Sequence, residues 1–274
     1  MCIDAFTYSA QPFIAEVTAN NGGGGTTRNY TGNYAKAVTL SDGNGVAGGT
    51  LNNTSLAAAA FVAGVGSNPL VATQTSATSP NYSFTSAQTP PATIKLRATE
   101  STGGDGVGSA TGTEDLMEIR SGKLVLGNAH GSELLGLTIP ISTRYWAAGG
   151  GYVTNVDDIC TMIPASSISM GAYTKNLSAC ETQLTQIGVT PIGDLNFEDG
   201  VLVAPLRLSA PGTGNSGSVD LLVNVAAASG NTCISAAQSA ASAANVPWLT
   251  TNTARATFGV YKGANEFIYL RENY

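Results

Sequence analysis

The chain has 274 residues, a formal net charge of −6 and only 11% charged residues. This acidic balance argues against binding nucleic acid through a basic surface, which needs clustered Lys and Arg to neutralise phosphates. An average soluble domain has roughly 25% charged residues, so the sparse charge favours an exported β protein or a subunit packed among others.

Membrane spanning and export can also be judged from the sequence. No apolar run reaches the roughly 18 residues that a transmembrane helix requires. The first residues, Met1-Cys2-Ile3-Asp4, have neither the basic nor the apolar region of a signal peptide. We therefore expect Met1 to be an artificial start, or the chain to be part of a longer precursor.

Residues 1–101 are predicted to form a first β domain. Apolar and polar residues alternate from Phe13 to Thr18, and further strands are indicated at 34–40, around 82–84 and at 93–98. The apolar segment 56–65 fits either a short helix or a strand buried on both faces. Short strands separated by turns are typical of an immunoglobulin-like β-sandwich, although the Cys, Trp and Cys spacing of antibody domains is absent.

Residues 102–115 are rich in Gly and Ser, which predicts a linker between two domains. A long loop inside the first sandwich is an equally good interpretation.

Residues 116–274 are predicted to form a second β-sandwich domain. Strands are indicated at 116–126, 134–146, 152–153, 201–208 and 219–225, and Pro140 marks an edge or a bulge. The Ala/Ser-rich segment 229–245 contains either a short helix at 235–244 or a loop. The last residues, ARATFGVYKGANEFIYLRENY (254–274), have two apolar runs around a Gly-Ala-Asn turn, which predicts a C-terminal β-hairpin that closes the domain.

Several blocks of the chain carry a family resemblance. They are FTYSAQPFIAEVTANN, NYTGNYAKAVTLS, IRSGKLVLGNAHGSELLGLTIPISTRYW, TNVDDICT with NLSACET, GSVDLLVNV and RATFGVYKGANEFIYLRENY. In this order they resemble the C-terminal region of the MshQ family of MSHA-type pilus biogenesis proteins. The resemblance implies a cell-surface protein associated with type IV pili, and it favours a strand at 56–65.

The four cysteines are Cys2, Cys160, Cys180 and Cys233, and none lies in a C-x-x-C spacing that would indicate zinc or redox chemistry. Cys160 and Cys180 flank a loop-like segment, and the family resemblance also pairs their blocks. We therefore predict a Cys160–Cys180 disulfide and, as a second bridge, Cys2–Cys233. Four buried free thiols are the alternative, which export disfavours.

Candidate catalytic groups are few. The single histidine, His130, could be a base oriented by Glu133. A turn between strands is the favoured interpretation, because a catalytic site requires several residues arranged together and one histidine does not supply them. The stretch GTGNSGS (212–218) has no following Lys and does not match a phosphate-binding loop. We predict no catalytic residues and no cofactor.

Two further groups of residues could bind ligands. Asp157 and Asp158 are the best candidates for Ca²⁺, which prefers carboxylate oxygens, although no spaced signature surrounds them. Four aromatic residues could line a carbohydrate platform, although such residues more often pack in cores; they are Tyr145, Trp146, Tyr152 and Trp248.

The sequence therefore predicts a non-catalytic, structural or adhesive protein, extracellular at a bacterial cell surface after export through the periplasm. Its expected partners are pilus subunits or other surface-assembly proteins. A carbohydrate-binding surface module that recognises glycans is the alternative. A hydrolase that depends on His130 is a third, more distant hypothesis.

Overall fold

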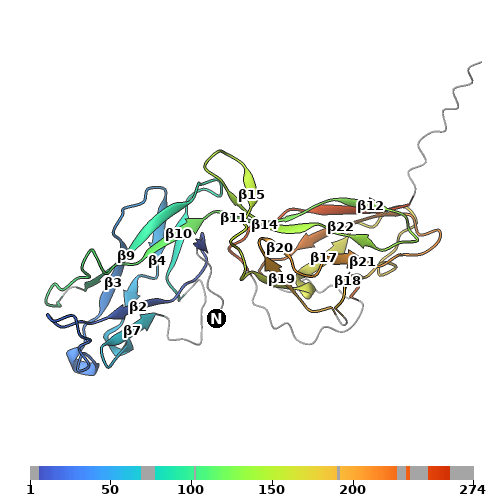
Figure 1. Ribbon diagram of the computed structural model, residues 1–274. Coiled ribbons are helices and arrows are strands. Elements are labelled where there is room, and N and C mark those ends of the chain that lie inside the picture. Colours follow the sequence, from blue (N-terminus) through green and yellow to red (C-terminus); the bar gives the residue numbers. More distant parts are fainter. Residues whose placement is uncertain are drawn as a thin grey trace, which may run out of the picture.

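The computed structural model describes residues 6–68, 78–101, 103–189, 192–226, 233–234 and 246–259. Figure 1 shows two β lobes joined end to end, with strands β1 to β10 in one lobe and the later strands in the other. Helical structure in the described part is limited to three short 3-10 turns, η1 (Gly32–Tyr34), η2 (Ala58–Ala60) and η3 (Ala165–Ser167). No described helix is long and apolar enough to cross a membrane.

The first lobe is built on a five-stranded sheet whose strand order is β1-β10-β9-β3-β5. β1 is parallel to β10, and the other neighbours are antiparallel. The strands of this sheet are β1 (Phe6–Tyr8), β3 (Val38–Asp42), β5 (Ser55–Leu56), β9 (Ala92–Glu100) and β10 (Leu116–Arg120).

Two smaller sheets complete the first lobe. One contains β2 (Ala15–Thr18), β6 (Phe61–Val62) and β7 (Val65–Asn68), and the other contains β4 (Gly49–Asn52) and β8 (Asn81–Phe84). The side chains that alternate inward form three small apolar clusters, centred on Phe61, Leu40 and Ile94.

The second lobe contains the larger core and three sheets. The largest has the order β11-β14-β20-β19-β16, and β15 also pairs with β14. Its strands are β11 (Gly122–Leu126), β14 (Ile141–Trp146), β15 (Tyr152–Thr154), β16 (Met162–Pro164), β19 (Asp194–Glu198) and β20 (Val201–Leu202).

The other two sheets of this lobe have the orders β12-β23-β22-β17 and β13-β21-β18. They contain β12 (Ala129–Gly131), β13 (Leu137–Thr138), β17 (Ile168–Gly171), β18 (Leu184–Gln186), β21 (Leu206–Leu208), β22 (Gly217–Val223) and β23 (Ala254–Phe258). Alternation explains how these strands bury one face: Leu206 and Leu208 in β21 are fully buried, whereas Arg207 between them is half-buried.

The all-β, sandwich-like fold predicted from the sequence is confirmed. The segment 56–65 is neither the helix nor the single strand that the sequence offered: it runs from the end of β5 through the turn η2, the two-residue strand β6 and a turn at 63–64 to the start of β7. The predicted C-terminal hairpin is described only as far as β23 and Gly259; its second arm, and the possible helix at 235–244, lie outside the described residues.

Strand β10 begins at the predicted domain boundary. The sequence assigned residues from 116 onward to the second domain, but β10 pairs with β9 and β1 in the sheet of the first lobe. Residues 103–115 therefore belong to a loop that connects two neighbouring strands of one sheet. Backbone hydrogen bonds from Glu100 to Val107 and from Ser109 to Ala98 hold the base of this loop.

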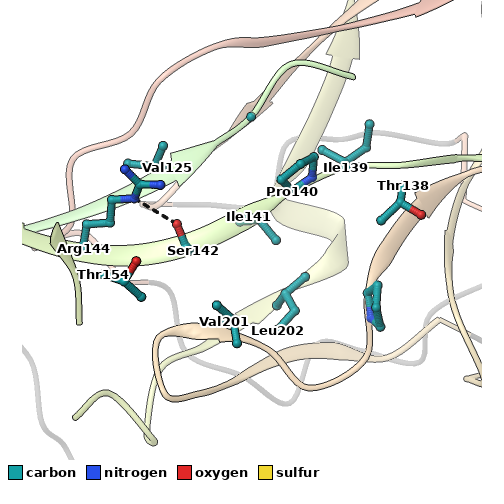
Figure 2. Close-up of a pocket in the computed structure, with 12 residues that line it drawn as sticks. Val125, Thr138, Ile139, Pro140, Ile141, Ser142, Arg144, Thr154, Val201 and Leu202 are labelled. Atoms are coloured by element: carbon teal, nitrogen blue, oxygen red, sulfur yellow. Dashed lines mark hydrogen bonds between the residues drawn. The ribbon is translucent and has the colours of Figure 1, made fainter. Parts of the chain in front are cut away.

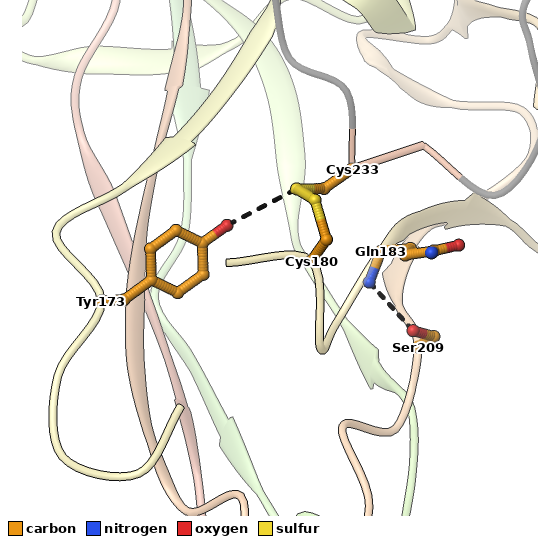
Figure 3. The surroundings of a disulfide bond; sticks show 5 residues. All are labelled: Tyr173, Cys180, Gln183, Ser209 and Cys233. Carbon is orange, nitrogen blue, oxygen red and sulfur yellow. Dashed lines mark hydrogen bonds between the residues drawn. A yellow bond between two sulfur atoms is a disulfide. The ribbon is translucent and has the colours of Figure 1, made fainter. Parts of the chain in front are cut away.

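The predicted cysteine pairing is wrong. Cys180 is bonded to Cys233, with Cα atoms 4.8 Å apart, so neither Cys160–Cys180 nor Cys2–Cys233 can form beside it (Figure 3). The reason is strand pairing: Leu184 forms a parallel bridge with Ile234 and donates its N–H to the carbonyl of Cys233, which brings these distant segments together. Cys160 is also disulfide-bonded, and Cys2 lies outside the described residues.

The Cys180–Cys233 bond predicts a measurable contribution to stability. It closes a loop across a sequence separation of 53, and the loop-entropy relation assigns such a bond about 4 kcal/mol. We expect the double variant Cys180→Ala/Cys233→Ala to lower the melting temperature by about 8 °C or more. Non-reduced peptide mapping should recover the Cys180–Cys233 pair, and recovery of Cys160 linked to Cys180 would contradict the structure.

Candidate functional site

The two lobes share a junction that β1 creates. β1 forms backbone hydrogen bonds with β10 in the first lobe, but the side chains of Phe6 and Tyr8 belong to the core of the second. Gly122 permits this approach, because a Cβ atom there would lie 2.3 Å from the Tyr8 ring. The lobes are therefore joined by a shared core as well as by the chain.

A buried hydrogen-bond network surrounds the Tyr8 hydroxyl. The hydroxyl donates to Asp158 Oδ2 at 2.7 Å and accepts from Asn155 Nδ2 at 2.7 Å. Asp158 is fully buried and also accepts from the backbone N–H of Thr161 at 3.0 Å and its hydroxyl at 2.8 Å. Burial, followed by the negative charge of Asp158, raises the pKa of the Tyr8 hydroxyl well above its usual range.

Arg120, the last residue of β10, forms the second part of the junction. Its guanidinium lies 4.5 Å from the ring centre of Phe6 and 4.6 Å from that of Tyr145, so two aromatic rings flank the cation. It pairs with Asp157 at 2.7 Å and donates to Asn155 Oδ1. Arg120 and Tyr8 thus both form hydrogen bonds with Asn155, and the junction is one connected network.

Both predicted calcium ligands therefore have protein partners. Asp158 accepts hydrogen bonds from Tyr8 and Thr161, and Asp157 pairs with Arg120. No cluster of three or more His, Cys, Asp or Glu residues suited to a metal ion occurs in the described part of the chain. The structure gives the two carboxylates a role in holding the lobes together.

A second group of residues lies on the outer face of the largest sheet. In β14, Ile141 and Thr143 point into the lobe and are buried, so Ser142, Arg144 and Trp146 point outward. The strand register places Lys123 and Thr154 beside Arg144, Val125 and Val201 beside Ser142, and Tyr152 beside Trp146. We call this set the β14 face; it consists of Lys123, Val125, Ser142, Arg144, Trp146, Tyr152, Thr154 and Val201.

The β14 face is hollowed at one end by a groove of about 370 Å³. Figure 2 shows Arg144 at one side of the groove, with its Nε donating to Ser142 Oγ at 3.2 Å, and Thr154 nearby. The rest of the lining is mainly aliphatic: Val125, Ile139, Pro140, Ile141, Val201, Leu202 and Pro205.

The four predicted ligand-binding aromatics do not form one platform. Trp146 and Tyr152 meet edge to face on the β14 face, with ring centres 5.2 Å apart. Tyr145 points to the opposite side of β14 and contacts Arg120, and Trp248 packs against the core of the second lobe.

The Trp146–Tyr152 pair lies close to the first lobe. The Tyr152 hydroxyl donates to the carbonyl of Ala87 at 3.1 Å, and Lys123 Nζ lies 5.2 Å from the centre of the Tyr152 ring. The junction thereby fixes this end of the β14 face against a loop of the other lobe.

The remaining candidate residues are dispersed. His130 is exposed in β12, opposite Thr257, and no described hydrogen bond joins it to Glu133. The stretch 212–218 forms a turn at 212–216 and then the first two residues of β22. Sequence reasoning missed Lys123 and Arg144. The alternation along ISTRYW could have placed Arg144 on the same face as Trp146. The position of Lys123 opposite Arg144, however, follows only from the strand register.

Comparison with known proteins identifies two domains of one family. Residues 1–116 match the third domain of DUF6701, and residues 120–273 match its fourth domain. The boundary between the two matches falls within β10: the first match ends at the first residue of this strand and the second begins at its last. The chain matches no curated protein and no solved structure.

The raised pKa of Tyr8 predicts a stability loss at alkaline pH. The hydroxyl ionises near pH 10 in the unfolded chain but stays protonated in the folded one, so its contribution is complete below pH 10 and falls above it, by up to about 1.4 kcal/mol per pH unit. Urea unfolding of Tyr8→Phe should show a shallower loss of stability than the wild type above pH 10. Tyr34→Phe, at an exposed tyrosine, is the matched control, and equal slopes for Tyr8→Phe and wild type would contradict the assignment.

Removal of the Asp158 carboxylate should also destabilise the protein. Asp158→Ala leaves the buried hydroxyls of Tyr8 and Thr161 without their acceptor, and each such unsatisfied group costs about 1–3 kcal/mol. We expect a loss of about 3 kcal/mol or more in urea unfolding. Asp115→Ala, at an exposed acid outside the network, should change stability little; a similar small effect at Asp158 would show that the network is not needed.

Proposed function

The chain belongs to the DUF6701 family, and we propose that it is a non-catalytic, extracellular structural or adhesive protein associated with type IV pilus biogenesis of the MSHA kind. The resemblance of its sequence blocks to the MshQ family supports the pilus association. The Cys180–Cys233 disulfide supports export, because such bonds persist in oxidising compartments.

The observation that carries the proposal is the junction between the lobes. Domains in one chain usually move relative to each other unless their interface is extensive and apolar. Here β1 pairs with one lobe and packs in the other, and Arg120 and Tyr8 add a buried polar network. An end-to-end body held this way (Figure 1) keeps a fixed spacing under load, which suits a structural or adhesive component.

The candidate catalytic residues support a non-catalytic role. His130 is exposed and is not among the residues that line the β14 groove, whose lining contains neither a histidine nor a carboxylate. Among the described residues, Tyr8, whose pKa is raised well above its usual range, is buried inside the junction together with Asp158, where no substrate can reach them.

The proposal predicts a surface location and an effect on pili. In cells that produce the protein naturally, antibodies against it should label unpermeabilised cells, and loss of the protein should reduce surface pili or pilus-dependent adhesion. Expression of the wild-type chain should restore both. Labelling only after permeabilisation would contradict the location, and unchanged pili and adhesion would contradict the pilus association.

A carbohydrate-binding module is the second candidate, and the Trp146–Tyr152 pair on the β14 face favours it. In that case a glycan array should show binding that Trp146→Ala abolishes. Tyr34→Ala removes an exposed aromatic ring in the other lobe and is the control. Absence of glycan binding, or binding unaffected by Trp146→Ala, would exclude this candidate.

A further inference from the structure

Two cations on the β14 face occupy an unfavourable position. Lys123 and Arg144 lie directly opposite each other on neighbouring antiparallel strands, an arrangement in which like charges destabilise a sheet. The chain has 12 basic and 18 acidic residues, yet none of the ion pairs in its described part includes Lys123 or Arg144. Two neighbouring cations on an otherwise acidic protein form a suitable binding site for an anion.

The groups around Arg144 suit a carboxylate. The guanidinium is a planar donor that binds a carboxylate through two parallel hydrogen bonds. Ser142 already accepts the Nε–H of Arg144, which leaves the terminal nitrogens for a ligand. Thr154 lies on the other side of Arg144 in the register and adds a hydroxyl.

The groove beside Arg144 suits aliphatic side chains. Its lining is dominated by branched and proline side chains, and Val201 at its rim is 49% exposed. A groove of about 370 Å³ holds one or two side chains of the size of Val or Leu. Burial of such side chains removes apolar surface from water, which favours binding.

From these contacts we propose that the β14 face docks a segment of a partner protein in which an Asp or Glu stands next to aliphatic residues. The carboxylate binds Arg144 and Lys123, and the aliphatic side chains enter the groove. Trp146 and Tyr152 border the site, and Trp, Tyr and Arg are the residues that dominate the energy of protein interfaces.

The same features disfavour an acidic polysaccharide as the ligand. Sugars bind best on open aromatic ring faces, but the groove lining contains no aromatic residue. Lys123 lies over the Tyr152 ring, and Trp146 meets that ring edge to face. Aliphatic walls with one cationic end match a peptide better than a chain of hydroxyl-rich rings.

Glu198 gives the docked segment a direction. It lies opposite Val201 on the neighbouring strand, at the side of the groove away from β11, and it is exposed. A second acid near this end would meet a like charge. The acidic residue of the segment therefore lies at the Lys123–Arg144 end, and neutral or basic residues follow towards Glu198.

A peptide library selected against the folded chain tests the proposal, and the test does not depend on the pilus association. Peptides from a random library are selected on the wild-type protein and depleted on the Arg144→Glu variant. We expect the surviving peptides to share an acid next to aliphatic residues. Calorimetry should show at least a tenfold weaker affinity for Arg144→Glu and Val201→Asp, and weaker binding to the wild type at high salt.

Arg28→Glu makes the same charge change at an exposed arginine of the first lobe and should alter affinity less than twofold. Circular dichroism establishes that each variant is folded. Failure to enrich any peptide, enrichment of peptides without a carboxylate, or equal binding to Arg144→Glu would each overturn the proposal. Arg144-dependent binding of hexagalacturonate with no enriched peptide would assign the face to an acidic polysaccharide instead.

Discussion

The hydroxyl of Tyr8 is the polar group on which the arrangement of the two lobes depends. Removing it from water is costly unless its hydrogen bonds are replaced, and Asp158 and Asn155 replace them across the junction. The charge of Asp158 is itself fully buried and is tolerated because several protein donors surround it. Each lobe therefore supplies groups that the other needs, and separation of the lobes would exchange these hydrogen bonds for bonds to water and would expose the core that Phe6 and Tyr8 complete.

This dependence extends to the surface. Tyr145 and Arg144 are adjacent in β14 and point to opposite sides, so the contact of Tyr145 with Arg120 fixes the strand whose outer side carries Arg144. The hydrogen bond of Tyr152 to Ala87 then secures the hairpin of β14 and β15 against the first lobe. The cations and the groove of the β14 face are held by the same interactions that make the molecule one body.

The polar groups of the molecule fall into two chemically different classes. Those at the junction, such as Asp158, are saturated with protein partners and have a structural role. Those on the β14 face, such as Arg144, keep donors directed outward beside apolar surface. Asp158, which the sequence marked for calcium, belongs to the first class, and the cations that it did not mark belong to the second; Asp157 pairs with Arg120 but is partly exposed.

Local patterns in the sequence were enough to determine the class of fold. Alternation of apolar and polar residues reflects the two faces of a strand, so stretches such as ISTRYW were recognisable without knowledge of their neighbours. The low charge and the family blocks likewise favoured a β protein; the export that they also suggested stays a prediction. Strand alternation and the family blocks are features of short segments, so they can be recognised without knowledge of where those segments lie in the fold.

Only the tertiary structure decided which segments meet. The predicted cysteine pairing was wrong because the contact of β18 with residues 233–234 brings Cys180 and Cys233 together. The spacing of the cysteines in the sequence does not reveal that contact. β10 joined the first lobe because β1 and β9 supply its hydrogen bonds. Lys123 faces Arg144 only through the register of β11 with β14. Pairing between distant strands depends on backbone groups that every residue has in common, and for that reason the sequence indicated many of the strands but not their partners.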